Sequence, residues 1–258
     1  AHSPPFNPSL TTFIETPSFP RIDMMSDTIA TRGNHQPVWV YEVGTDLETG
    51  EPIETRAGTT GIYTNPFGPL ITGVSKLGAV PGFEFFAVPG VETDPPTMFD
   101  VFPGAPAVTG EATIVFKGNY TVDGAGKTGV FYRELFDQDI NDKPGGGDNP
   151  VVLIANNIDT LIPGTDQVFG STSPPSAADG SVIFAGFDDE WDPTLGGIYL
   201  APLEDTPELR TLVSIGQRVP GESVKATFNN LGEGGAFDGR YVGFWGAWGT
   251  ETRTVRLY

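Results

Sequence analysis

The 258-residue sequence suits one large β domain or two small ones, and it is long enough to bury a core. Its 34 glycines, 24 prolines and 18 phenylalanines are typical of a globular chain with many turns and short elements. The 14 basic and 33 acidic residues give a formal charge of −19, which repels phosphate backbones and anionic lipid. Nucleic acid and membrane surfaces are therefore excluded as expected partners, and a protein or a glycan is favoured.

The sequence also bears on compartment. There is no cysteine, which excludes disulfides and thiolate metal sites. No apolar run approaches the roughly 18 residues that a membrane span needs, so no membrane insertion is expected. The sequence opens AHSPPFNPS without an initiator methionine, as after cleavage of a signal peptide. We expect a secreted protein, extracellular or at the cell surface.

Short apolar stretches, rich in Val, Ile, Phe and Tyr and bounded by turn residues, predict β-strands along the whole chain. The first is TIATRG at 28–33, and PVWVYEV at 37–43 and EPIETRAG at 51–58 are interpreted as the two strands that follow it. PGFEFFAVPG at 81–90 could be the first strand of a degenerate fifth unit, or one unit carries a long insertion. The sequence leaves both alternatives open.

Beyond residue 110 the same order of strands occurs twice. A strand after an Asp-Gly turn or its counterpart (the DG strand) is followed by a strand resembling GGIYL (the GIY strand) and then by a closing strand. The first set is ATIVFKG (112–118), TGVFYREL (128–135) and PVVLIANN (150–157), and the second is DGSVIFAG (179–186), GGIYLAPL (196–203) and ELRTLVSIG (208–216). A further DG strand, DGRYVGFWG, lies at 238–246.

A phenylalanine lies ten residues before each of these turns. The four pairs are Phe13 and Asp23, Phe99 and Thr109, Phe169 and Asp179, and Phe228 and Asp238. Agreement at four places indicates a true internal repeat, and repeats of this length favour propellers or solenoids.

The two ends of the chain are interpreted as parts of one unit. TVRLY at 254–258 matches a GIY strand, and one unit is thus split between 1–22 and 238–258. Closing a ring by pairing N- and C-terminal strands would remove exposed sheet edges. We therefore predict an all-β fold in a single domain (1–258), a β-propeller of four or five blades of about 50–65 residues. A β-sandwich with repeated hairpins is the alternative.

The DG-x-V-x-F phrase, with GIY and VPG after it, resembles the repeats of secreted bacterial proteins of the NxxGxxAF (choice-of-anchor) type. The resemblance runs through 109–118, 179–186, 219–221 and 238–246. This chain has Asp or Thr where that pattern has Asn, and it shows no sorting anchor, which predicts loss or truncation of that segment. The resemblance implies export and a propeller-like fold, and it implies no activity.

The loop DQDINDKPGGGD (137–148) places oxygen ligands at positions 1, 3, 5 and 12, a spacing that can wrap calcium. The candidate ligands are Asp137, Asp139, Asn141 and Asp148. Against this, the sixth position is aspartate rather than glycine, and the loop also fits a solvated hairpin connection.

A second acidic loop, FDDEWDP (187–193), surrounds a tryptophan with carboxylates, an arrangement that can bind or cleave sugars. Its candidate ligand-binding residues are Asp188, Asp189 and Trp191, although an acidic surface loop explains the pattern equally. In GFWGAWG (243–249), Trp248 is the expected surface residue, and Trp245 is expected in the core.

No convergent catalytic set is recognisable, because only His2 and His35 are present and no histidine cluster can build a zinc site. We therefore expect an extracellular, non-catalytic binding or structural module. One alternative is a polysaccharide-active enzyme, a lyase or glycoside hydrolase. Another is a subunit of an extracellular assembly that self-associates by exchange of terminal strands.

Overall fold

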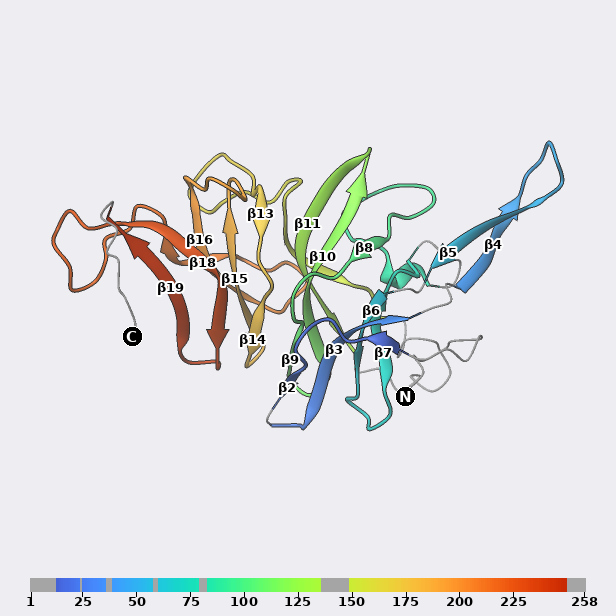
Figure 1. The fold of residues 1–258 in the computed structure, drawn as a ribbon, viewed down its shortest axis with the longest axis horizontal. Helices are drawn as coiled ribbons and strands as arrows, with labels where there is room; N and C mark the ends of the chain where they lie inside the picture. The colour runs from blue at the N-terminus through green and yellow to red at the C-terminus, as the bar shows by residue number, and fades with distance from the viewer. Residues whose placement is uncertain are drawn as a thin grey trace, which may run out of the picture.

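A computed structural model of the chain describes residues 13–23, 25–35, 39–57, 60–78, 83–135 and 149–249. These residues form an all-β structure in which every strand pairing is antiparallel (Figure 1). The helical element among them is the short 3₁₀ helix η1 (Glu84–Phe86). Within these ranges no helix has the length and apolar character that a membrane crossing requires.

The strands form three five-stranded sheets, a fourth sheet of two strands and a separate hairpin. The first sheet contains β1 (Phe13–Glu15), β2 (Arg21–Asp23), β3 (Thr28–His35), β6 (Thr60–Thr64) and β7 (Ile71–Ser75). The second contains β8 (Phe99–Val101), β9 (Ala107–Thr109), β10 (Thr113–Val122), β11 (Ala125–Glu134) and β12 (Val152–Asn156). The third contains β13 (Ser171–Thr172), β14 (Ser176–Ala178), β15 (Ser181–Phe187), β16 (Gly196–Pro202) and β17 (Arg210–Ser214). The fourth pairs β18 (Phe228–Phe237) with β19 (Val242–Trp248), and the hairpin pairs β4 (Trp39–Thr45) with β5 (Pro52–Ala57).

The first three sheets share one strand order. In each, the DG strand (β3, β10 or β15) pairs on one side with the GIY strand, which then pairs with the closing strand. On its other side it pairs with two short strands that follow each other in sequence, such as β8 and β9 beside β10. Each sheet is therefore a four-stranded antiparallel meander whose outer strand is interrupted, and the predicted repeat of the strands is confirmed.

The Asp-Gly phrase forms a hairpin turn. Asp179 and Gly180 have φ of 49° and 67°, and they connect Ala178 to Ser181, which lie directly opposite each other in β14 and β15. Positive φ at both central residues defines the tight turn whose twist matches that of the paired strands, and Asp-Gly is a favoured sequence for it. The phrase thus directs the chain from the interrupted outer strand into the DG strand.

Two strand assignments in the first unit are wrong. Residues 37–43 and 51–58 contribute to β4 and β5, which pair with each other in a hairpin that projects from one end of the molecule (Figure 1). The true GIY strand is β6, which carries Gly61–Ile62–Tyr63, and the closing strand is β7. Residues 81–90 contribute η1 rather than a strand. The long insertion, not a fifth unit, explains the loosened pattern between residues 34 and 110.

One packing arrangement recurs in each sheet. The phenylalanine of the ten-residue spacing lies against a glycine of the DG strand, so close that a β-carbon on the glycine would lie 2.5–2.8 Å from ring atoms. The four pairs are Phe13 and Gly33, Phe99 and Gly118, Phe169 and Gly186, and Phe228 and Gly246. In the first three sheets, the same phenylalanine meets an aromatic ring of the GIY strand edge to face, with ring centres 4.8–5.2 Å apart (Tyr63, Phe131 and Tyr199).

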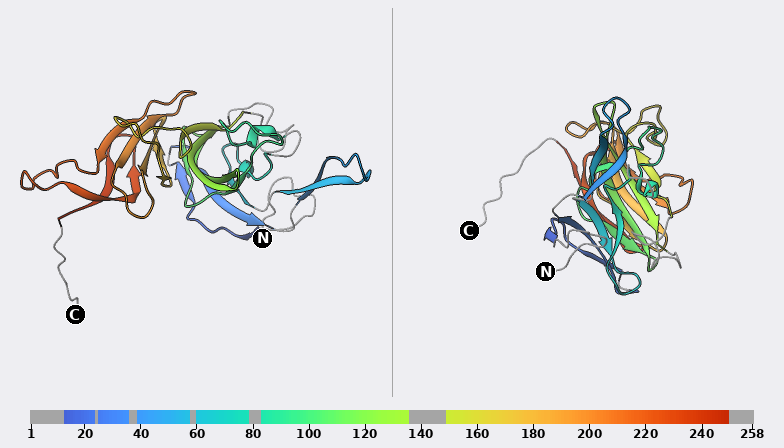
Figure 2. Two further views of the ribbon diagram at one scale, coloured as in Figure 1. Left: turned by 90° about the horizontal axis from the view of Figure 1, so that it is seen from above. Right: turned by 90° about the vertical axis from the view of Figure 1, so that its right-hand side faces the viewer.

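The sheets follow one another in a row, and buried apolar side chains fill each space between neighbours. Figures 1 and 2 place the first sheet near one end of this row and the fourth at the other. The described strands do not close into a ring, because β1 pairs with β3 and β19 pairs with β18. The predicted closure depends on residues 1–12 and 250–258, which lie outside the described residues. The structure thus establishes an all-β fold, and its sheets fit propeller blades and a stacked sandwich equally.

A fully buried arginine links the first two sheets. Arg133 in β11 donates from Nη1 to the Gly73 carbonyl of β7 and from Nε to the Asn149 carbonyl, both at 2.6 Å. Its guanidinium also lies 5.1 and 5.0 Å from the ring centres of Phe85 and Phe86. Because burying a charge is costly without such partners, these contacts fix the second sheet, the first sheet and η1 against one another.

The recurring glycine gives a test of the packing. We expect Gly118→Ala to lower the free energy of unfolding by about 1–3 kcal/mol, because its β-carbon would overlap the Phe99 ring. The control is Gly126→Ala in the neighbouring strand, where a β-carbon would meet no atom within 4 Å. Urea unfolding measures both variants, and equal midpoints for the two would contradict the packing argument.

Candidate functional site

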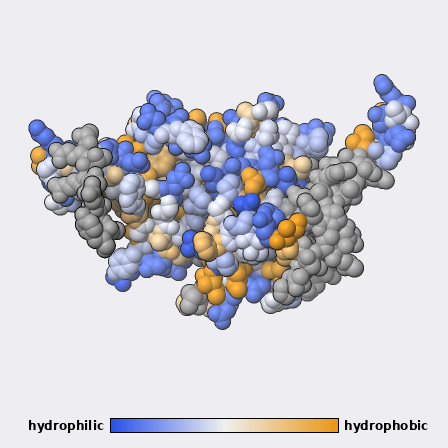
Figure 3. Space-filling view, in the orientation of Figure 1, coloured by the Kyte–Doolittle hydropathy of each residue, from blue (hydrophilic) through white to orange (hydrophobic). Residues whose placement is uncertain are grey.

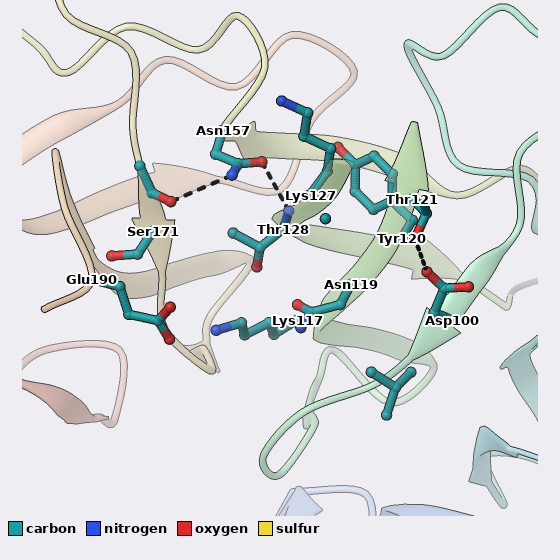
Figure 4. Close-up of a pocket in the computed structure, with 13 residues that line it drawn as sticks. Asp100, Lys117, Asn119, Tyr120, Thr121, Lys127, Thr128, Asn157, Ser171 and Glu190 are labelled. Carbon is teal, nitrogen blue, oxygen red and sulfur yellow. Dashed lines mark hydrogen bonds between the residues drawn. The ribbon is translucent and has the colours of Figure 1, made fainter. Parts of the chain in front are cut away.

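A polar pocket of about 460 Å³ opens between the second and third sheets (Figure 4). Its walls come from β8, the second half of β10, the start of β11, β13 and the loop after β15. Two hydrogen bonds join the sheets beside it. The hydroxyls of Thr128 and Thr172 are hydrogen-bonded to each other at 3.1 Å, and the side-chain amide of Asn157 donates to the Gly170 carbonyl at 3.4 Å. The pocket is therefore held by two sheets whose relative position is fixed by packing and by polar contacts.

Three buried polar atoms of the pocket-lining residues have no hydrogen-bond partner within the protein. They are Oδ1 of Asn119, the hydroxyl of Tyr120 and the hydroxyl of Ser171. Burial raises the pKa of Tyr120 to about 12, with a smaller contribution from the negative charge of Asp159, so this hydroxyl keeps its proton at neutral pH. Buried polar groups are normally paired. The Tyr120 ring packs in the core between the first and second sheets, against Phe99 and Phe131, so the unpaired groups left to hydrogen-bond a ligand in this pocket are those of Asn119 and Ser171.

The pocket also carries both signs of charge. Burial lowers the pKa of the Lys117 ammonium, and the negative charges of Glu233 and Glu190 oppose part of that shift. In Figure 4 the Lys117 side chain extends toward Glu190, and Asp100 lies on the opposite side of the pocket. Asp100 is oriented by the Thr121 hydroxyl, which donates to its Oδ2 at 2.8 Å.

In the acidic loop at 187–193, the two predicted carboxylates Asp188 and Asp189 hold the loop together by hydrogen bonds. Asp188 accepts hydrogen bonds from the Thr194 and Leu195 amides and from the Thr194 hydroxyl, at 2.6–2.9 Å. Partial burial acts to raise its pKa, but these hydrogen bonds prevail and hold the pKa below its usual value. Asp189 accepts from the backbone amides of Trp191 and Asp192, which lower its pKa in the same way.

These two carboxylates therefore fold the loop onto itself, while their neighbour Glu190 lines the pocket. Trp191, next to Glu190, is 89% exposed. Of the three loop candidates, Asp189 and Trp191 are exposed and Asp188 is partly buried, and both carboxylates accept hydrogen bonds from their own loop.

The fourth sheet holds the other predicted aromatic candidate. Trp248 in β19 is 46% exposed, and it is not among the residues that line the pocket. The expectation that Trp245 belongs to the core is wrong, because this side chain is 59% exposed. It lies on the face of β19 that points away from the third sheet, and no described sheet covers that face.

The calcium candidates Asp137, Asp139, Asn141 and Asp148 lie outside the described residues. Among the residues that are described, no three acidic, histidine or cysteine side chains lie close enough together to hold a metal ion.

Sequence reasoning did not select Lys117, Asn119, Tyr120 or Ser171. A usable signal was present in the repeat itself: Lys117 and Asn119 occupy DG-strand positions that the third sheet fills with Ala185 and Phe187, counted from Gly118 and Gly186. Polar residues at positions that are apolar in a sister unit mark a local departure from core packing.

Comparisons with known protein families, with curated proteins and with solved structures found no match for this chain.

The charges around Lys117 give a second test. Glu190→Gln removes a carboxylate that raises the Lys117 pKa, so we expect that pKa to fall further below the ordinary lysine value. The Lys117 side-chain carbon signal, followed by NMR against pH, measures it. Glu208→Gln, at an exposed site absent from the causes of this shift, is the control. An unchanged titration in Glu190→Gln would contradict the arrangement in Figure 4.

Proposed function

We propose that this protein is an extracellular, non-catalytic binding module, and that the pocket between its second and third sheets takes a small hydroxyl-rich ligand, a saccharide. The observation that carries the proposal is the pair of unpaired polar side-chain atoms on Asn119 and Ser171, two residues that line the pocket. A ligand that hydrogen-bonds these atoms removes an energetic penalty that the protein bears when they are unpaired.

The chemistry of the pocket favours a saccharide over an ion. Donors from Lys117 and Lys127 stand beside acceptors from Asp100 and Glu190, and sugar hydroxyls both donate and accept. The formal charge of −19 disfavours polyanions, and the presence of lysines disfavours a simple cation site. The volume of about 460 Å³ is within the usual range of small-molecule sites. The exposed ring of Trp191 offers an apolar face beside Glu190 on which a sugar ring can stack.

A specific observation favours a second function, a polysaccharide-active enzyme. Two carboxylates, Asp100 and Glu190, line the same pocket as a lysine whose pKa burial lowers. Paired acids serve glycoside hydrolysis, and lysines with lowered pKa values serve as bases. Product release from a bound oligosaccharide distinguishes this function from simple binding.

The propeller is part of the proposal as well. The interrupted four-stranded meander, repeated in three consecutive sheets, supports blades of a propeller-type arrangement. Export, the resemblance to secreted NxxGxxAF-repeat proteins and assembly by exchange of terminal strands also stay proposals, supported by the sequence alone.

The saccharide proposal predicts which signals and variants respond. Titration with a panel of neutral and acidic oligosaccharides, followed by NMR, should shift backbone signals of 117–121 and 126–128. We expect Asn119→Leu to weaken binding about tenfold, the effect of losing one well-formed hydrogen bond in a buried site. Asn230→Leu, an exposed asparagine of the fourth sheet, is the matched control. If no saccharide shifts these signals, the proposal fails, and the appearance of shortened products would establish the enzyme instead.

Calcium binding by the 137–148 loop stays a prediction. If Asp137, Asp139, Asn141 and Asp148 bind the ion, added calcium should raise the melting temperature of the protein, because a ligand that binds only the folded state stabilises it. Asp139→Ala should abolish the rise, and Asp166→Ala, in a different loop, should retain it. A melting temperature indifferent to both calcium and chelator would exclude the site.

A further inference from the structure

The spaces between consecutive sheets are built from equivalent positions. We call the side of a sheet that packs on the next sheet its forward face, and the side that packs on the preceding sheet its backward face. Ala30 of the first sheet packs in one core with Ile114 of the second. Val115 of the second sheet packs in the next core with Val182 of the third. Ala30 and Val115 each lie three residues before the recurring glycine of their own strand, so they occupy equivalent forward positions. Ile114 and Val182 each lie four residues before it, so they occupy equivalent backward positions.

Among the described residues, no sheet packs on the forward face of the last sheet. Trp245 occupies the forward position that Ala185 fills in the third sheet, where it is 3% exposed. At Trp245 the exposed fraction is 59%. The ring lies beside Gly232, whose hypothetical β-carbon would be 3.3 Å from it, and Gly243 and Ala236 pair next to it. The large Trp245 ring therefore protrudes from a surface formed by small residues.

The backward face of the first sheet is buried at its middle, where Tyr63 is 2% exposed, and it is uncovered at the end formed by β2 and the start of β3. Ile22 and Ile29 lie opposite each other in β2 and β3, and they are 49% and 40% exposed. Their counterparts in the second sheet, Val108 and Ile114, pair in the same way and are 5% and 0% exposed. Figure 3 shows hydrophobic side chains gathered over the lower end of β2 and β3. The apolar pair that the second sheet buries is therefore largely uncovered here.

We propose that these two faces bind each other between copies, so that the last sheet of one chain stacks on the first sheet of a second copy, head to tail. Three interfaces of this kind already exist within the chain, and the contact between copies continues the series. The two open faces lie toward opposite ends of the row (Figures 1 and 2), so in this arrangement they reach a second copy and not each other. Such a contact is heterologous, and it propagates into a filament or closes a ring of several copies.

This contact differs from exchange of terminal strands, because it joins sheet faces and breaks no existing strand pairing. It is independent of the saccharide pocket. The net charge of −19 opposes association, whereas the two faces contribute apolar area. Added salt should therefore strengthen the association by screening the repulsion.

The first experiment measures mass by light scattering over a range of protein and salt concentrations. We expect an average mass above that of the monomer that increases with both. Trp245→Glu should weaken the association at least tenfold, whereas Trp191→Glu, which alters another exposed tryptophan, should leave it unchanged. A monomer under all conditions, or equal behaviour of the two variants, would overturn the proposal.

The second experiment locates the contact, and the absence of native cysteine gives it no background. Chains with Gly243→Cys are mixed with longer, tagged chains carrying Ile29→Cys, at positions equivalent to Val115 and Val182 of the second core. Packed sheets lie about 10 Å apart, which is farther than a disulfide reaches, so a bis-maleimide reagent of matching length is used. We expect it to link the two chain lengths, and not to do so when Trp191→Cys replaces Gly243→Cys. Urea midpoints close to that of the unmodified protein verify that the variants fold. In a chain with both cysteines, a cross-link within the monomer would show that one chain closes its own ring, and the proposal would fail.

Discussion

The contact between a phenylalanine and a glycine, made once in each sheet, is the constraint on which the rest of the structure depends. The ring fills the space that a β-carbon on the glycine would occupy, so the interrupted outer strand is fixed to the DG strand at one register. An aromatic residue of the GIY strand then meets that ring edge to face in three sheets. Each of the first three sheets thereby presents the same aromatic cluster on its backward face. The sheets stack by repeating this arrangement.

Much of this was predictable from the sequence because the repeat is written in residues with strict local requirements. The ten-residue spacing from phenylalanine to turn, the Asp-Gly turn and the GIY strands of the second and third units locate their elements correctly. The first unit misled because β4 and β5 are good strands by composition, and composition does not specify a partner. The GIY triplet at 61–63 was the better guide, since its glycine closely approaches the carbonyl of Val74 in the closing strand.

The candidate site was less predictable, and the reason is physical. Acidic loops are easily selected as candidate sites because their composition is unusual. In this loop, however, Asp188 and Asp189 accept hydrogen bonds from backbone amides of the loop itself. The pocket instead depends on Lys117 and Asn119, whose chemistry matters only because the neighbouring sheet covers them. A single strand carries no information on which face is covered. Comparing sister units position by position recovers part of it, since Ala185 in the third sheet shows what an ordinary core residue is there.

Arg133 has a consequence for how the molecule unfolds. An arginine cannot shed its charge inside a protein, so its burial is tolerable only while Gly73, Asn149 and the rings of η1 remain in place. Separating the first sheet from the second would break the hydrogen bond from this guanidinium to the Gly73 carbonyl. The contact therefore favours states in which the two sheets stay together. The first two sheets should behave as a single cooperative unit, whereas the fourth sheet, which carries no such buried charge among its described residues, can fray independently.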